Sequence, residues 1–159
     1  MEKMCVFSTT EGKLLKIDDI KAQWEQDCPI DPSELGRESL KIPVLHNRYL
    51  VMLMHEKSVL KSHQIKYDEL LRLKFEYYTG KLDEETLAQM KWSPMNFRLL
   101  KSDVELYLNA DRDLNDIKLR MALQQEKVDF LQSVIQNINS RNFLIKNAID
   151  WAKFQNGVM

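Results

Sequence analysis

The strongest constraint on the fold is the stretch from Asp111 to Gln155, which contains no glycine and no proline. Residues recur through it in a seven-residue pattern that forms one seam along a helix. The seam positions are Leu114, Ile117, Met121, Gln124, Val128, Leu131, Ile135, Ile138, Asn142, Ile145, Ile149 and Ala152. The pattern predicts one long C-terminal helix from Asp111 to about Gln155.

Apolar residues beside this seam make the apolar stripe wider than a two-stranded coiled coil needs. They are Leu119, Leu123, Phe130, Val134, Leu144, Trp151 and Phe154. One interpretation is an assembly of several copies, in which the buried polar positions Gln124 and Asn142 fix register and partner number. The other is an antiparallel hairpin within one chain, and both can hold. For assembly we expect contacts through Leu114, Ile117, Met121, Val128, Leu131, Ile135, Ile138, Ile145 and Ile149.

A second long helix is predicted over residues 43–79. Pro43 marks its start or a kink, and the next glycine or proline is Gly80, which can end a helix cheaply because it tolerates a positive φ. The first half of this helix is apolar on more than one side, so it needs neighbouring helices. The expected fold class is therefore all-α, with long helices in a helical hairpin or bundle.

Shorter helices are predicted around these two. One begins near Leu14, and proline-containing pairs suggest further starts after Asp31 and Ser93, with Asp83 capping another. The helix after Ser93 would carry one apolar stripe made by Phe97, Leu100, Val104 and Tyr107. We expect a loose arm over residues 1–13, an N-terminal helical region over 14–110 and an oligomerisation helix over 111–159.

Composition and motifs argue against an enzyme. The two cysteines form no CxxC pair, the three histidines are not spaced as helical metal ligands, and no phosphate loop is present. We expect no catalytic residue, no metal and no cofactor. No segment resembles a signal peptide or reaches the roughly 20 apolar residues of a membrane helix, so we expect a cytoplasmic protein with no membrane contact.

The net charge is −1, so binding to a polyanion requires a local basic patch. Residues 41–81 carry eight Lys and Arg against four Asp and Glu. Within them, residues 71–81 read LRLKFEYYTGK and alternate cations with aromatics, which is typical of sequence-tolerant single-strand binding. The alternative is that these aromatics are the buried end of a helix and the cations its solvated rim.

Helical spacing divides the basic residues of this motif. Arg72 and Lys74 are two residues apart, so a regular helix directs them to nearly opposite sides. Tyr67, Lys74, Tyr78 and Lys81 share one face at spacings of seven, four and three residues. The candidate nucleic-acid-binding residues are Tyr67, Arg72, Lys74, Tyr77, Tyr78 and Lys81.

The run RLKFEYYTGK resembles the basic motif of the UvsY family, the recombination mediators of tailed phages. Two later segments, LNADRDLNDIKLRM and SRNFLIKNAIDWAKFQNG, are similar to the start and end of that family's last helix. The three matches occur in the family's order, and we expect the similarity to the family to extend over residues 14–157.

The resemblance implies a protein that binds single-stranded DNA and assembles through its C-terminal helix into a ring, a hexamer or heptamer. It also implies loading of a RecA-type phage recombinase onto DNA covered by the phage single-strand DNA-binding protein, in the host cytoplasm. The family's DNA-contacting pair falls on Arg72 and Lys74, with the usual order of Lys and Arg reversed. The alternatives are a helical scaffold or assembly adaptor that binds only proteins, and an RNA chaperone.

Overall fold

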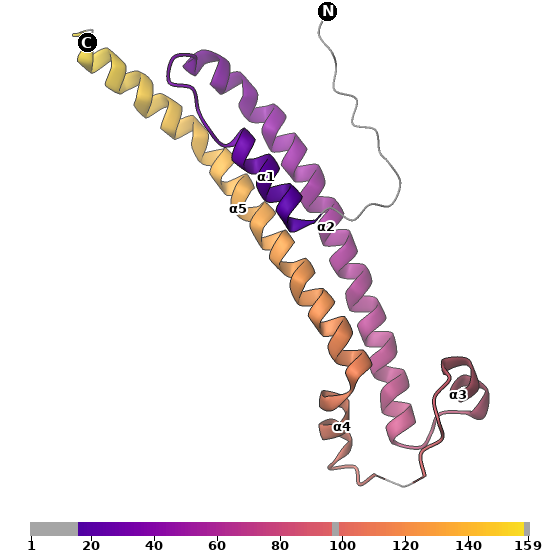
Figure 1. Cartoon of the computed structure of the whole chain (residues 1–159). Helices are drawn as coiled ribbons and strands as arrows, with labels where there is room; N and C mark the ends of the chain where they lie inside the picture. Colours follow the sequence, from indigo (N-terminus) through magenta and orange to yellow (C-terminus); the bar gives the residue numbers. More distant parts are fainter. Residues whose placement is uncertain (1–15, 97–98, 158–159) are drawn as a thin grey trace, which may run out of the picture. The chain divides into compact units, whose positions relative to one another are not determined.

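The computed structural model describes residues 16–96 and 99–157. Over these residues the chain forms helices and no strand, which confirms the all-α prediction (Figure 1). The helices are α1 (Ile17–Asp27), α2 (Leu35–Tyr78), α3 (Glu84–Met90), α4 (Val104–Ala110) and α5 (Arg112–Gln155). Two compact units divide the chain, and both α2 and α5 contribute residues to each. One unit holds the chain up to Leu45 and from Ser140 onward, and the other is His46–Asn139.

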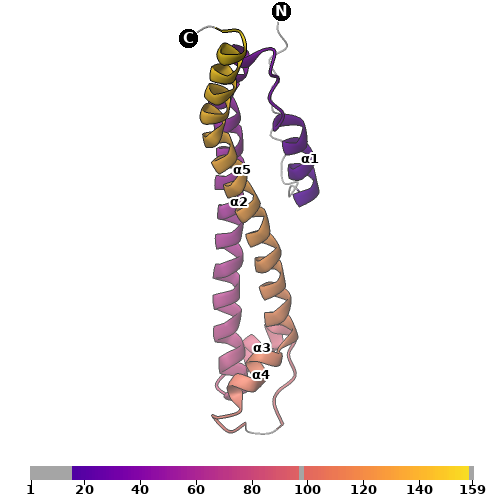
Figure 2. The same cartoon turned by 90° about the vertical axis from the view of Figure 1, so that its left-hand side faces the viewer.

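In the unit His46–Asn139, α2 and α5 lie side by side and run antiparallel, as the two views show (Figures 1 and 2). Polar contacts fix their register, since Gln124 reaches Glu56 and Lys74 reaches Asp113. Apolar side chains from both helices form the buried core of this unit: Tyr49, Leu53, Leu114, Val128, Leu131, Val134 and Ile138. The predicted intramolecular hairpin is therefore present in this unit.

Helix α2 begins at Leu35, eight residues earlier than the predicted start at Pro43. Proline has no N–H, so Pro43 cannot bond to the carbonyl of Ser39. Both residues are exposed, so water can satisfy that carbonyl and the helix continues through the proline. The true start follows the Asp31 turn, where the Asp31 carboxylate accepts hydrogen bonds from the backbone and hydroxyl of Ser33 at 2.8 and 2.6 Å.

The short helices agree only in part with those predicted from the sequence. Helix α1 forms as predicted, and the Asp83 carboxylate caps α3 by accepting from the backbone N–H of Thr86 at 2.7 Å. The prediction that a helix starts at Ser93 is wrong, because the described residues between Trp92 and Asp103 are not helical. Tyr77 donates to the Ser93 carbonyl, a tertiary contact that replaces the local cap. Leu100 precedes α4, so the predicted stripe does not form, and Phe97 lies outside the described residues.

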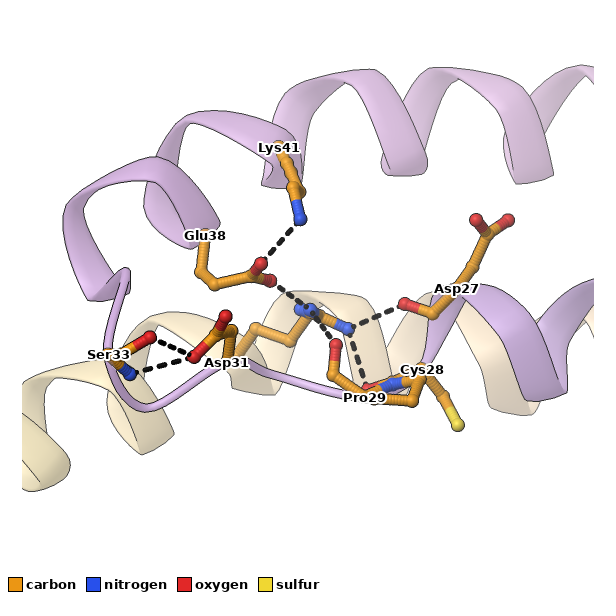
Figure 3. A network of polar contacts seen from close by, with 8 residues as sticks. Asp27, Cys28, Pro29, Asp31, Ser33, Glu38 and Lys41 are labelled. Atoms are coloured by element: carbon orange, nitrogen blue, oxygen red, sulfur yellow. Dashed lines mark hydrogen bonds and ion pairs between the residues drawn. The ribbon is translucent and has the colours of Figure 1, made fainter.

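In the other unit, Arg141 joins α5 to the end of α1 and the start of α2 (Figure 3). Its buried guanidinium donates to the carbonyl oxygens of Asp27, Cys28 and Pro29 at 3.1–3.2 Å. It also pairs with Glu38 at 3.1 Å, and the pKa of that carboxyl is held below its usual range, chiefly by the hydrogen bond from Lys41. Arg141 therefore satisfies carbonyls that the end of a helix leaves unpaired.

Candidate nucleic-acid interface

The candidate interface lies at the C-terminal end of α2, which ends as predicted at Gly80. Gly80 has a φ of 68°. Its N–H bonds to the carbonyl of Tyr77, and the N–H of Lys81 bonds to that of Glu76 at 2.8 Å. This pair of bonds is the Schellman motif, which requires a residue that accepts a left-handed conformation. The helix end therefore positions the basic and aromatic side chains of residues 71–81.

Lys74 is buried and paired within the chain. Only 6% of the residue is exposed, and its ammonium lies 2.6 Å from Asp113 and 2.9 Å from Asp111. The same nitrogen sits 4.2 Å from the centre of the Trp92 ring. Burial alone would lower the pKa of Lys74, but its hydrogen bonds to Asp113 and Asp111 hold that pKa above the ordinary value. In this conformation Lys74 joins α2 to the start of α5.

Asp111 is the centre of this contact. Its carboxylate accepts from Lys74, from the Tyr78 hydroxyl at 2.7 Å, and from the backbone N–H of Leu114 at 3.1 Å. Burial disfavours the ionised carboxylate, yet the hydrogen bonds from Lys74, Tyr78 and Leu114 hold the pKa of Asp111 below its ordinary value. Asp111 therefore starts α5, as predicted, and anchors the end of α2 to it.

The tyrosines of the motif also have partners within the chain. Tyr77 donates to the Ser93 carbonyl at 2.8 Å, and its ring meets those of Tyr78 and Trp92 at centroid distances of 5.2 Å. Burial, together with the hydrogen bond to Asp111, raises the pKa of Tyr78 well above that of an ordinary tyrosine. Tyr67 lies under Lys118, whose nitrogen is 5.7 Å from the ring centre. These contacts agree with the alternative in which the aromatic residues of the motif pack within the chain.

Arg72 has a different environment from Lys74. Two-thirds of its side chain is exposed, and its Nη1 atom pairs with Glu76 on the next turn at 3.0 Å. Lys81, just after the helix, is exposed as well. The structure therefore separates the two cations that the motif places together: Arg72 faces solvent and Lys74 faces α5.

A pocket beside Arg72 was not foreseen from the sequence. It has a volume of about 380 Å³ and is lined by Asp68, Leu71, Arg72, Phe75 and Leu108. Phe75 belongs to the motif, and 47% of it is exposed. The spacing of Arg72 and Phe75 could have indicated this pocket, because residues three apart share one face of a helix.

The predicted oligomerisation residues fall into two groups. Leu114, Val128, Leu131, Ile138 and Ile145 are buried within one chain, and Ile117, Met121, Ile135 and Ile149 retain partial or full exposure. Gln124 is buried as expected for a polar seam position, while Asn142 is exposed. The buried group has a structural role in the single chain, and a role in oligomer contacts stays a prediction.

Within the described residues, no group of histidine, cysteine or acidic side chains is arranged to hold a metal ion. None of the helices in the described part of the chain is long and apolar enough to span a membrane.

A family model described as the recombination, repair and single-stranded DNA-binding protein UvsY matches residues 23–158. The chain belongs to this family, which confirms the resemblance seen in its motifs. It is 22% identical to the recombination protein UvsY of Enterobacteria phage T4 over 90% of this chain and 99% of that protein.

Crystal structures of the bacteriophage T4 recombination mediator protein UvsY share the fold. One superposes with a TM-score of 0.78 at 22% identity, covering 90% of this chain and 99% of that chain. A second gives a TM-score of 0.77 at 21% identity, covering 88% and 99%.

Proposed function

We propose that this protein is a recombination mediator. In this role it binds single-stranded DNA as a homo-oligomer and loads a RecA-type phage recombinase onto DNA coated by the phage single-strand DNA-binding protein. Membership of the UvsY family supports this proposal, as does the mediator fold that the chain shares over most of its length. Its place of action would be the host cytoplasm.

The observation that carries DNA binding is the exposed guanidinium of Arg72 next to the half-exposed ring of Phe75. A cation and an aromatic face together supply the two attractions that hold single strands, one for phosphate and one for bases. The ion pair of Arg72 with Glu76 is exposed, and such pairs contribute less than about 1 kcal/mol. A phosphate can therefore compete with Glu76 for Arg72.

Lys74 contributes differently in this proposal. Its two carboxylate partners already neutralise the ammonium, so it supports the interface by fixing the end of α2 against α5. Arg72 and Lys81, the exposed cations of the motif, give a weak site in a single protomer with a net charge of −1. Repetition around an oligomer compensates, because linked weak sites gain avidity steeply.

The test is a titration of fluorescent single-stranded DNA across a range of salt concentrations, with wild type and Arg72→Ala. Each phosphate neutralised on a single strand contributes a slope of about −0.7 in log affinity against log salt. We expect Arg72→Ala to weaken DNA binding. We also expect it to make the salt slope shallower by about 0.7 for each protomer whose Arg72 contacts a phosphate. Arg120→Ala removes the same charge from an exposed position on α5 and should leave both quantities nearly unchanged.

A second measurement separates mediation from binding. The recombinase is given single-stranded DNA already coated by its binding protein, and its ATP hydrolysis is followed with and without this protein. Acceleration by wild type, and less by Arg72→Ala, would support mediation. DNA binding without acceleration would contradict the mediator role, and no binding to DNA would favour a scaffold that contacts only proteins.

A further inference from the structure

We propose that the pocket between α2 and α4 binds one unstacked base of single-stranded DNA, with Phe75 as its stacking surface. This inference rests on the proposed function and adds a ligand group to the same interface. Phosphate binding by Arg72 and base binding beside it are separate contacts. Each can therefore be removed without the other.

The pocket is an open surface hollow with a mostly apolar lining. Its volume of about 380 Å³ falls within the range of roughly 300–1,000 Å³ that is usual for small-molecule sites. Leu71 and Phe75 from α2 and Leu108 from α4 supply its apolar wall. Phe75 lines the pocket and 47% of the residue is exposed, which suits the stacking of a base, because every base has an apolar face.

Charge at the rim favours a nucleotide with its base inward and its phosphate outward. Arg72 lines the pocket and lies three residues before Phe75, so both are on one face of α2. The guanidinium of Arg72 has five N–H donors. Only its Nη1 atom pairs with Glu76, so donors on the other nitrogens can serve a phosphate. Asp68 at the rim accepts a hydrogen bond from Gln64, and its negative charge repels a phosphate, leaving the side near Arg72 for the backbone.

The same face of α2 continues this alternation of cation and apolar surface. Lys61 and Ile65 precede Arg72 by eleven and seven residues, which places them on its side of the helix, and both are exposed. A strand following this face meets Lys61, Ile65, Asp68, Arg72 and then Phe75 in turn. Lys61 and Arg72 are the two cations that this face offers to phosphates, and the carboxylate of Asp68 between them is unfavourable for a phosphate.

The test compares an oligothymidylate with an abasic oligonucleotide of equal length, which keeps the phosphates but has no bases. Wild type should bind the thymidylate more tightly. Phe75→Ala should reduce that preference by about tenfold, because the stacking of one base on an aromatic side chain contributes affinity of that order. Phe75→Trp should restore it, and Phe75→Ala should leave the salt slope unchanged.

Two variants serve as controls. Arg72→Ala should make the salt slope shallower, which Phe75→Ala leaves unchanged; because Arg72 also lines the pocket, its base preference is not used as a control. Leu106→Ala removes an exposed apolar side chain from α4 that does not line the pocket, so its preference should match wild type. The oligomer mass of every variant is measured alongside the affinity.

The inference is overturned if Phe75→Ala prefers the thymidylate as strongly as wild type does. It is also overturned if Phe75→Ala changes the oligomer mass and not the base preference, because a second copy of the chain would then cover the pocket. In both cases DNA binding by wild type would leave the proposed function standing. If wild type binds neither oligonucleotide, the proposed function fails, and the base site fails with it.

Discussion

At the scale of single residues, the different environments of Arg72 and Lys74 are the main result. The two cations are separated by one residue, yet one is exposed and the other lies between Asp111, Asp113 and Trp92. A buried ion pair contributes little relative to an apolar pair, but removing one partner is costly because the other charge stays buried. Lys74 is therefore a residue whose loss affects stability before it affects DNA binding.

We predict that Lys74→Met lowers the free energy of unfolding by about 3 kcal/mol, the cost of leaving buried Asp111 without its cation. Urea unfolding followed by circular dichroism measures this change. Arg72→Met, which removes an exposed cation from the same helix, should change the unfolding free energy by less than about 1 kcal/mol. A Lys74→Met protein of normal stability that no longer binds DNA would instead show that Lys74 contacts the strand directly.

At the scale of helices, the register of α2 against α5 depends on a buried polar contact. The Gln124 side chain donates to the Glu56 carbonyl oxygen at 2.9 Å and also to the Glu56 carboxylate. Lys127 lies 3.5 Å from that carboxylate, and the Oε1 atom of Glu56 is buried with no hydrogen-bond partner. Polar groups placed in this way in a helix seam specify register at a cost in stability.

We predict that Gln124→Leu lowers the free energy of unfolding by about 2 kcal/mol, because it leaves the buried Glu56 carboxylate with one partner fewer. Glu56→Leu combined with Gln124→Leu should be less destabilising than the sum of the two single changes, since the carboxylate and its donor are removed together. A double-mutant cycle of urea unfolding measures the coupling. Additive effects would contradict this account of the pair.

At the scale of the whole molecule, the apolar residues that one chain leaves exposed point to assembly. On α5 after Ser140 they are Phe143 (72%), Leu144 (55%), Ile149 (36%), Trp151 (60%) and Phe154 (75%). The Trp151 and Phe154 rings stack at a centroid distance of 5.7 Å. Clustered exposed apolar side chains usually mark a surface that another protein covers. We propose that a second copy of the chain covers these residues.

We predict that Trp151→Ser with Phe154→Ser reduces the oligomer mass measured by analytical ultracentrifugation. DNA affinity should fall at the same time, although Arg72 is intact, because avidity is lost. The matched control is Leu106→Ser, which removes an exposed apolar side chain from α4 and should leave the mass unchanged. A monomeric variant that binds DNA as tightly as wild type would contradict the need for assembly.

Local sequence signals accounted for the two long helices, for α1 and α3, and for several helix ends. Glycine-free and proline-free stretches predicted two long helices, and the expected helix end at Gly80 and caps at Asp83 and Asp111 are present. These features depend on residues close together in the chain, so their physical causes are visible in the sequence. The opposite directions of Arg72 and Lys74 also follow from their spacing on the helix.

Contacts between distant residues decided the rest. Arg141 rather than Asn142 is buried in α5, and Lys74 is held by carboxylates 37 and 39 positions away in the sequence. Each outcome depends on what another helix places opposite the side chain, and helical periodicity carries no information about that partner. Periodicity therefore determined which residues lie on a common face of each helix, while tertiary packing determined which of those faces are buried and which remain open to a ligand.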